Sequence, residues 1–405
     1  MNSLANPDDD PFPCANRSAQ LQRPDNGGVI RAEAVIDLEA LCRNLSAISE
    51  MIKGPAIMAV VKADAYGHGM VPVAQAARSA GVPWLGVALP SEARDLRASG
   101  DTGRILAWLW APGDDHLEPC VDADVDISVS SLWALAEVAA AARSVGLRAR
   151  VHLKVDTGLS RNGAGRAEWP RLLAAAREKQ DRGVIEIVGI WSHLANADCP
   201  DDQSVADQIT AFDAAYEAVC EAGLQPELRH LANTAAAIDY PGSRYDLVRV
   251  GIGMYGVHPS TPGSAKTLGL APVMTLRSRL ALVKTIPAGQ SVSYGSQWTA
   301  ASATRVGLVP VGYADGIPRA ASGRAEVQVR GVRCPVIGRI AMDQFVIKLD
   351  DRLSEVKAGD DVVIFGDESG GAPTAGDWAV ASDSIGYELV TRVSSRVPRR
   401  YLGAR

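Results

Sequence analysis

The chain lacks the features that would place it among membrane, zinc-binding or nucleic-acid-binding proteins. No apolar run approaches the length that crosses a bilayer, so we expect no membrane association. The six cysteines are scattered, without a C-x-x-C pair or a paired histidine spacing, which argues against a metal site and favours reduced thiols in the cytoplasm. The net charge is −6, and only Arg396–Arg400 is locally basic. We interpret that stretch as solvated, so we expect no nucleic-acid partner.

Two common phosphate-binding loops are also missing. No G-x-G-x-x-G follows the first predicted strand, and no Walker-type loop is present. An open, doubly wound sheet that binds a dinucleotide is therefore disfavoured. Residues 1–28 carry an acidic run and several prolines without an apolar core, so we expect a disordered leader rather than a secretory signal.

What the chain does contain is ordinary globular composition at a length typical of two domains. It has 405 residues, of which 47% are hydrophobic and 22% charged. From Val29 onward, short aliphatic runs alternate with segments of helical period, among them 91–98, 131–145, 167–179 and 203–222. Ser131 and Asp202 are candidate N-caps. The predicted strands are 56–61, 84–88, 104–109, 126–129, 149–155, 186–191, 227–231 and 246–250.

Eight strand–helix repeats over about 250 residues predict a (β/α)8 TIM-type barrel. After about Leu270 the helical period stops, and β-branched alternation takes over near 280–286, 305–309, 326–330, 345–349 and 361–365. The fold class is therefore α/β, with an N-terminal barrel at 29–270 and a C-terminal all-β domain at 271–405.

Polar residues gather at one end of the predicted barrel strands. Lys62, Lys154, Asn233 and Arg249 fall at or just after the ends of strands, and two more residues lie in the loops beyond, Arg161 and His193. Barrel enzymes build their active sites on the carboxyl ends of the strands. Ordinary surface residues would scatter over both ends, so this clustering predicts an active site.

Lys62 closes a buried strand and precedes a turn that Gly67 and Gly69 permit. Poor solvation at such a position lowers the pKa of a lysine and makes its amine a usable nucleophile, as a Schiff-base lysine requires. A solvated lysine that merely ends a strand is the alternative for Lys62 taken alone.

Four segments together carry a resemblance that favours the catalytic interpretation. The segments Val60–Gly69, Lys154–Gly163, Val248–Gly256 and the V-S-Y-G run Val292–Gly295 resemble the alanine racemase family, and the resemblance extends from about Ala32 to Tyr401. It implies a barrel followed by a β-domain, with the first strand, near Val29–Val35, pairing with that domain. It also implies pyridoxal 5′-phosphate (PLP) as cofactor and a homodimer whose active sites are shared between subunits.

The resemblance assigns two acid–base groups and their supports. Lys62 holds PLP and serves one face of the substrate, and Tyr294 from the neighbouring subunit serves the other. Arg161 contacts the cofactor and the substrate carboxylate. The lysine matching Lys154 is carbamylated in many relatives, and that anion holds the arginine. Arg249 faces the pyridine nitrogen, with His193 as its hydrogen-bond partner.

Further assignments concern the phosphate and the substrate. Tyr313 lines the substrate entrance, the Met342 amide binds the carboxylate across the dimer, and Ala341 replaces a common cysteine. The phosphate ligands implied are Tyr66, Asn233, Thr234, Gly251, Ile252 and Tyr387.

The implied function is two-base interconversion of L- and D-alanine on a PLP aldimine, supplying peptidoglycan. A serine or broad-specificity racemase is the runner-up, because Ala341 would enlarge the pocket. A PLP-dependent decarboxylase would place an acid where Arg249 stands. A non-catalytic PLP-binding regulatory protein would lack the β-domain and Tyr294.

Overall fold

The computed structural model describes residues 30–199, 202–260 and 265–403, so the leader expected over 1–28 lies outside it. The chain divides into two compact units. The barrel unit comprises Ser46–Ala65 and Val73–Gly251. The β unit comprises the described residues up to Leu45, Tyr66–Pro72 and the chain from Ile252 onward. Helix α1 (Leu38–Ile52) runs from one unit into the other.

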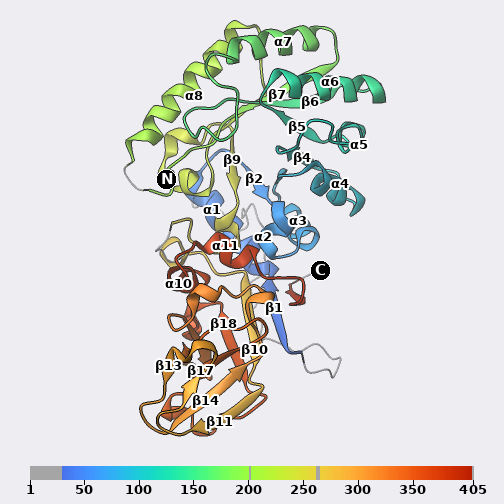
Figure 1. Cartoon of the computed structure of the whole chain (residues 1–405). Coiled ribbons are helices and arrows are strands. Elements are labelled where there is room, and N and C mark those ends of the chain that lie inside the picture. Colours follow the sequence, from blue (N-terminus) through green and yellow to red (C-terminus); the bar gives the residue numbers. More distant parts are fainter. Residues whose placement is uncertain (1–29, 200–201, 261–264, 404–405) are drawn as a thin grey trace, which may run out of the picture. The chain divides into compact units, whose positions relative to one another are not determined.

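The barrel unit contains eight strands that pair in parallel in the order β8-β7-β6-β5-β4-β3-β2-β9 (Figure 1). β8 and β9 stand at the two ends of this order, and two backbone hydrogen bonds between their segments close the sheet. Asp246 N–H donates to Arg229 O at 3.2 Å, and Arg249 N–H donates to Ala232 O at 3.0 Å. The predicted barrel is confirmed. Its strands are β2 (Ala56–Val60), β3 (Trp84–Val87), β4 (Arg104–Ala107), β5 (Asp126–Val129), β6 (Ala149–Lys154), β7 (Ile185–Trp191), β8 (Leu228–His230) and β9 (Leu247–Val250).

Helices separate these strands and lie outside the sheet, as α6, α7 and α8 show in Figure 1. Both predicted N-caps are confirmed: Ser131 accepts from Ala134 N–H at 3.3 Å, and Asp202 accepts from Ser204 N–H at 2.8 Å. Such a cap stabilises a helix by about 1 kcal/mol. The helices are α2 (Lys62–Gly67), α3 (Met70–Ser79), α4 (Pro90–Ala98), α5 (Leu117–Asp122), α6 (Leu132–Val145), α7 (Trp169–Asp181), α8 (Gln203–Glu221) and α9 (Thr234–Asp239).

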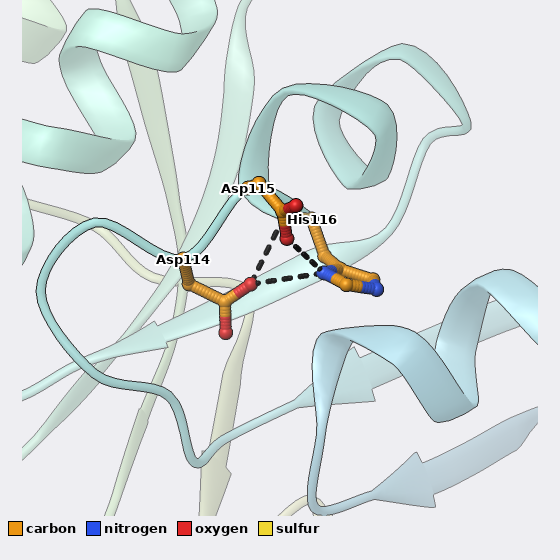
Figure 2. A group of neighbouring side chains, drawn as sticks. All are labelled: Asp114, Asp115 and His116. Atoms are coloured by element: carbon orange, nitrogen blue, oxygen red, sulfur yellow. Dashed lines mark hydrogen bonds and ion pairs between the residues drawn. The ribbon is translucent and has the colours of Figure 1, made fainter.

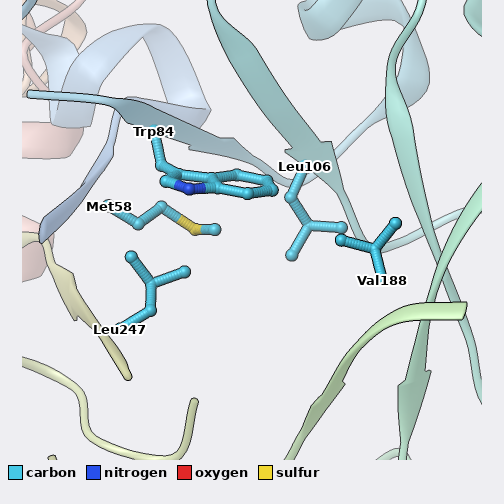
Figure 3. Packing of buried hydrophobic residues seen from close by; sticks show 5 residues of the cluster. All are labelled: Met58, Trp84, Leu106, Val188 and Leu247. Atoms are coloured by element: carbon cyan, nitrogen blue, oxygen red, sulfur yellow. The ribbon is translucent and has the colours of Figure 1, made fainter. Parts of the chain in front are cut away.

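Apolar side chains from five strands point toward one another and pack as one cluster (Figure 3). Each member is at most 5% exposed, and Trp108 and Leu228 pack against them. The barrel interior is therefore filled by side chains rather than open as a pore. The cluster consists of Met58, Trp84, Leu106, Val188 and Leu247.

The β unit is organised by a nine-stranded sheet in the order β11-β14-β17-β16-β15-β18-β10-β1-β19. Strand β1 (Ala32–Asp37), from the start of the described chain, pairs antiparallel with β10 (Met274–Arg279) and parallel with β19 (Arg399–Leu402). The other strands are β11 (Leu282–Ile286), β14 (Thr304–Val309), β15 (Glu326–Val329), β16 (Val332–Ile337), β17 (Phe345–Lys348), β18 (Asp361–Phe365) and the short pair β12 (Ser291–Val292) and β13 (Trp298–Thr299).

Two short helices, α10 (Ala375–Ala381) and α11 (Gly386–Thr391), accompany the sheet, although the sequence pattern indicated only strands there. Thr374 and Asp377 form a reciprocal capping box at the start of α10. That local hydrogen bonding explains a helix too short to show a period in the sequence.

The interpretation of Arg396–Arg400 as a solvated stretch is wrong for its last two residues. Arg399 is half-buried and donates to the carbonyls of Gly67, Val393, Ser394 and Val397. Arg400 Nε donates to the buried carboxylate of Glu33 at 3.1 Å. These arginines belong to β19, and their charge is used inside the unit. No helix in the described parts of the chain has the length and apolar character needed to cross a bilayer.

Candidate active site

Lys62 begins a turn of left-handed helix directly after β2. The φ angles of Ala63, Asp64, Ala65 and Tyr66 lie between 52° and 54°, and those of Gly67 and Gly69 are 79° and 97°. A left-handed conformation costs roughly 1–2 kcal/mol for each residue other than glycine. The turn predicted at the two glycines is confirmed, but four residues with side chains share its conformation. Strain of this kind, held by the surrounding structure, is typical of functional sites.

The environment of Lys62 suits a nucleophilic amine. Burial lowers the pKa of Lys62, the positive charge of Arg161 lowers it further, and Glu92 opposes both. The ammonium nitrogen lies 6.0 Å from the centre of the Trp108 ring. A lowered pKa favours the neutral amine, which is the form of lysine that attacks a carbonyl.

Lys154 ends β6 and is 5% exposed. Burial, Arg249 and Arg161 lower the pKa of Lys154 to about 7. Its Nζ lies 4.1 Å from the centre of the Trp191 ring. The loop beyond is held by Asp156, whose carboxylate accepts the N–H groups of Gly158 and Ser160.

Arg161 lies exposed in that loop. Its charge acts on Lys62, Lys154 and His193, so the structure brings these predicted residues into one electrostatic cluster. The positive charge of Arg161 beside two lysines makes this part of the site favourable for an anion.

Arg249 is buried in β9 and surrounded by acceptors. Its Nη2 donates to the carbonyls of Ser192 and Leu231 at 2.9 and 2.8 Å and to His193 Nδ1 at 3.2 Å. Burial, and then the charge of Arg249, lowers the pKa of His193 well below its usual value. The expected pair of His193 and Arg249 is therefore present, with a neutral imidazole as acceptor.

Two further histidines at this site were not singled out by the sequence. His230 is the last residue of β8, and its Nδ1 accepts from Arg249 Nη1 at 3.1 Å. On the other side of the ring, His230 Nε2 lies 2.9 Å from His152 Nδ1. His152 precedes Lys154 by two positions in β6, and side chains two apart in a strand share a face. That spacing was the available signal.

On the late strands, a cradle of small polar groups follows β8 and β9. Asn233 Oδ1 caps α9 by accepting Ala236 N–H at 3.0 Å, and Thr234 Oγ1 accepts Gly251 N–H, also at 3.0 Å. The hydroxyl hydrogen of Thr234 is left to donate elsewhere. Ile252 follows at once and begins the short helix η2 (Ile252–Tyr255).

Tyr66 and Tyr387, also predicted to bind the phosphate, lie in the β unit. Tyr66 packs against Tyr255 with ring centres 4.9 Å apart and against Tyr387 at 6.2 Å. Burial raises the pKa of Tyr66 above its ordinary value, so the phenol stays protonated and can donate a hydrogen bond.

Three predicted substrate-side residues are exposed in the β unit: Tyr294 (73%), Tyr313 (39%) and Met342 (52%). Tyr313 N–H donates to Ala341 O at 3.1 Å, and Ala314 N–H donates to Met342 O at 2.9 Å, so Tyr313 and Met342 are neighbours. Tyr294 begins the short helix η4 (Tyr294–Ser296).

A separate cluster of polar groups lies before α5, where Asp114, Asp115 and His116 face one another (Figure 2). His116 Nδ1 lies 3.2 Å from Asp114 Oδ1 and 2.6 Å from Asp115 Oδ1. Three consecutive residues of a loop explain this proximity as local ion pairing, and we assign no metal to it.

The donor set of the barrel unit fits PLP. Lys62 has the lowered pKa that a Schiff base needs, Arg249 is a buried cation at the strand ends, and Thr234 retains a hydroxyl hydrogen beside the start of α9. Fold and site together define a barrel enzyme whose residues at the strand ends suit PLP.

Comparison with known proteins agrees. Residues 36–259 match the family model described as alanine racemase, N-terminal domain, and residues 273–401 match alanine racemase, C-terminal domain. The alanine racemase of Streptomyces coelicolor is 50% identical over 391 residues, covering 95% of this chain and 99% of the relative. That of Frankia casuarinae is 48% identical over 377 residues, with 93% and 97% covered. The solved alanine racemase of D-cycloserine-producing Streptomyces lavendulae superposes with a TM-score of 0.90 at 50% identity, with 93% and 98% covered.

The chain belongs to the alanine racemase family, whose members depend on PLP.

Proposed function

We propose that this protein interconverts L- and D-alanine with PLP as cofactor, and that its D-alanine supplies peptidoglycan. The observation that carries the proposal is Lys62, a lysine of lowered pKa placed at a barrel strand end among cations that suit an anionic cofactor. The alignments with the two alanine racemases named above cover nearly the whole of this chain.

Racemisation removes the Cα proton on one face of the substrate and returns a proton on the other. Bound PLP supplies the electron sink that makes this proton removable. Lys62 moves the proton on one face through its neutral amine, and Tyr294 serves the opposite face through its phenol. Arg161 binds the carboxylate with its fork of donors and limits the poses that the amino acid can take.

The rest of the barrel residues hold the cofactor. Thr234, Asn233 and the amides at Gly251 and Ile252 bind the phosphate with Tyr66 and Tyr387, where hydroxyl and N–H donors suit a dianion. Arg249 would face the pyridine nitrogen of bound PLP. A permanent cation there would disfavour protonation of that nitrogen, which would keep the electron sink moderate and limit side reactions.

Two subunits complete one site in this proposal. Tyr294, Tyr313 and Met342 have functions at the substrate, yet all three are exposed in a single chain. Large apolar side chains that are exposed together commonly mark an interface. We therefore assign them to the site of a partner subunit in a homodimer. A cytoplasmic location fits the thiols of Cys120, Cys199, Cys220 and Cys334, which form no disulfide.

Substrate preference depends on the neighbourhood of Met342. Ala341 stands beside it with a small side chain, which favours a broader pocket as the second candidate, a serine or broad-specificity racemase. A non-catalytic PLP-binding protein is disfavoured, because the chain carries the complete C-terminal domain of the family with Tyr294 in it.

The decisive experiment incubates PLP-loaded protein in deuterated water with L-alanine, L-serine or L-lysine and follows Cα exchange and chirality together. Exchange with inversion, fastest on alanine, is the expected result. Comparable inversion of serine or lysine would favour the broad-specificity racemase. Exchange without inversion would refute a working acid–base group on the second face.

A further inference from the structure

A file of four buried polar side chains runs through the barrel interior to Arg249. Asp126 Oδ2 lies 3.0 Å from His152 Nε2, His152 Nδ1 lies 2.9 Å from His230 Nε2, and His230 Nδ1 lies 3.1 Å from Arg249 Nη1. Asp126, His152 and His230 are completely buried, and Arg249 is 4% exposed. The members come from β5, β6, β8 and β9, so the file crosses most of the barrel.

The chemistry of its two ends gives the file one direction. A guanidinium can only donate hydrogen bonds, so His230 Nδ1 must accept and His230 Nε2 must carry the proton. His152 Nδ1 then accepts from His230, and His152 Nε2 carries a proton that it donates to Asp126. Every hydrogen therefore points away from Arg249 and toward Asp126. The arrangement requires both imidazoles to be neutral, and burial together with the neighbouring groups lowers the pKa of His230 well below its usual value.

The carboxylate end is firmly held. Asp126 also accepts from Arg104 Nη2 at 2.9 Å and from Arg150 Nε at 2.6 Å. Two arginines keep Asp126 ionised, because protonation of this carboxylate would weaken both charge-assisted hydrogen bonds. The far end of the file is thus a fixed acceptor, as the arginine end is a fixed donor.

Aromatic rings enclose the two histidines. Trp191 stacks on His230 with ring centres 5.5 Å apart and planes 7° from parallel, and Trp84 meets His152 edge-on at 5.5 Å. The same Trp191 ring faces Arg249, whose guanidinium carbon lies 4.9 Å from its centre. In so apolar an enclosure, an imidazole that turned or took up a proton would leave a buried polar group unsatisfied.

We propose that Asp126, His152 and His230 are positioning residues for Arg249. Asp126 and His152 keep His230 neutral with its Nδ1 as acceptor, and His230 in turn holds the guanidinium of Arg249 where the pyridine ring of PLP would bind. The proposal rests on the function proposed above, since it takes Arg249 as the group that faces the pyridine nitrogen. Nitrogen protonation strengthens the electron sink, so misplacing Arg249 raises transamination relative to racemisation.

The first experiment does not depend on activity. Nitrogen NMR of histidines in the PLP-loaded full chain reports which ring nitrogen carries the proton. We expect both His152 and His230 to be neutral with the proton on Nε2, assigned by comparison with the variants below. A proton on Nδ1 of either ring, or a protonated imidazole, overturns the proposal, whether or not the protein racemises alanine.

The second experiment breaks and restores the file. In His152→Gln one amide supplies an acceptor and a donor about as far apart as the two ring nitrogens, so the direction of the hydrogen bonds is kept. In His152→Phe the ring remains and both bonds are lost. Leu106→Ala, in the apolar cluster of the same barrel, is the control for loss of packing alone.

Transamination converts L-alanine and PLP to pyruvate and pyridoxamine phosphate. The readout is the number of these transamination events divided by the number of racemisation events. We expect His152→Phe to raise this ratio about tenfold, a change of 1.4 kcal/mol in relative barriers, while His152→Gln and Leu106→Ala stay near the parent value. An unchanged ratio in a folded His152→Phe refutes the proposal. If that variant does not fold, a raised ratio in His152→Gln or a wrong tautomer in the parent refutes it. Absence of racemisation in the parent overturns the proposed function instead.

Discussion

The carboxylate of Glu92 accepts the backbone N–H of Ala63, the residue after Lys62, at 2.6 Å. Its second oxygen accepts the N–H groups of Ala88 and Leu89 at 2.9 and 3.0 Å, at the start of α4. One side chain therefore caps a helix and also holds the first residue of the strained left-handed turn. Nothing in the sequence pattern indicated either use of Glu92.

We expect Glu92→Ala to release PLP more readily than the parent and to lower the free energy of unfolding by about 0.5–2 kcal/mol, because α4 loses its cap and Ala63 N–H loses its acceptor. PLP affinity and stability of Glu92→Gln should fall between those of the parent and Glu92→Ala, since the glutamine amide retains one acceptor oxygen. PLP dissociation constants and urea unfolding measure both effects. Glu118→Gln, an exposed acid in the first turn of α5, is the control. PLP affinity unchanged in Glu92→Ala would show that the turn holds itself.

Lys62→Ala should abolish the visible absorbance of covalently bound PLP, because no other described lysine is predicted to carry it. The measurement is an absorbance spectrum after dialysis against PLP-free buffer. Lys53→Ala removes an exposed lysine nearby in the chain and should leave the spectrum intact. Retained absorbance in Lys62→Ala would mean that another amine holds the cofactor.

Tyr294→Phe should suppress proton removal from one enantiomer by roughly 10²–10⁴-fold while PLP binding stays near normal, because the phenol acts on a single face of the substrate. Exchange of the Cα proton for deuterium, measured separately from L- and D-alanine, detects the asymmetry. Tyr240→Phe, which alters a phenol hydrogen-bonded to Cys199 O in the barrel unit, is a suitable control. If the variant lost PLP binding together with proton removal from both enantiomers, the result would show a structural role for Tyr294 instead.

Lys154 should carry a carbamate when carbon dioxide is present. Its pKa of about 7 leaves much of the amine neutral near pH 7, which is the form that reacts, and the product anion would relieve the repulsion from Arg249 and Arg161. Intact-protein mass spectra under bicarbonate, compared with carbon-dioxide-free buffer, should show the gain of one CO2, and Lys154→Ala should not show it. Equal masses for the parent in both buffers would contradict the prediction.

Asp126 should make stability depend on pH in the acid range. Burial opposes its ionisation, but the hydrogen bonds from His152 and the two arginines outweigh burial and lower the pKa of Asp126 from 3.8 to about 2. The depressed pKa stabilises the fold at pH values above that of the unfolded state, and the contribution, about 2 kcal/mol, is lost as the pH falls from about 4 to 2.

Urea unfolding at several pH values tests this dependence against Asp126→Asn. The variant should be less stable by about 1.5–3 kcal/mol at pH 7, because Arg104 and Arg150 lose a buried charged acceptor, although each keeps a second carboxylate nearby. It should also lose less stability on acidification than the parent. Parallel acid profiles would show that Asp126 is not the group responsible.

The sequence predicted the barrel closely because its strands are short apolar runs separated by capped helices. Lys62, Arg249 and His193 were also within reach, since each follows or ends such a run. The left-handed turn was not, because Ala63, Asp64 and Ala65 carry no residue-type signal for φ near 53°. The turn is held by contacts from distant elements, among them Glu92 at Ala63 N–H and Arg399 at Gly67 O.

Long-range pairing explains the other omissions. His152 and His230 lie 78 positions apart and acquire meaning only when β6 and β8 come together. The sequence pattern indicates that Arg399 and Arg400 are solvated, but they lie in β19, which pairs with β1 in the sheet. A local pattern reports which face a side chain takes, but not which partner meets it there.

The position of β1 also orders events during synthesis. Glu33 in β1 pairs with Arg277, 244 residues later, and the same strand waits for β19 on its other edge. The strands of the barrel unit, by contrast, leave the ribosome in nearly the order in which they pair. The barrel can therefore form while translation proceeds, whereas the unit that carries Tyr294 is completed only when the final strand emerges. Until then the edge of β1 that β19 covers has no strand beside it.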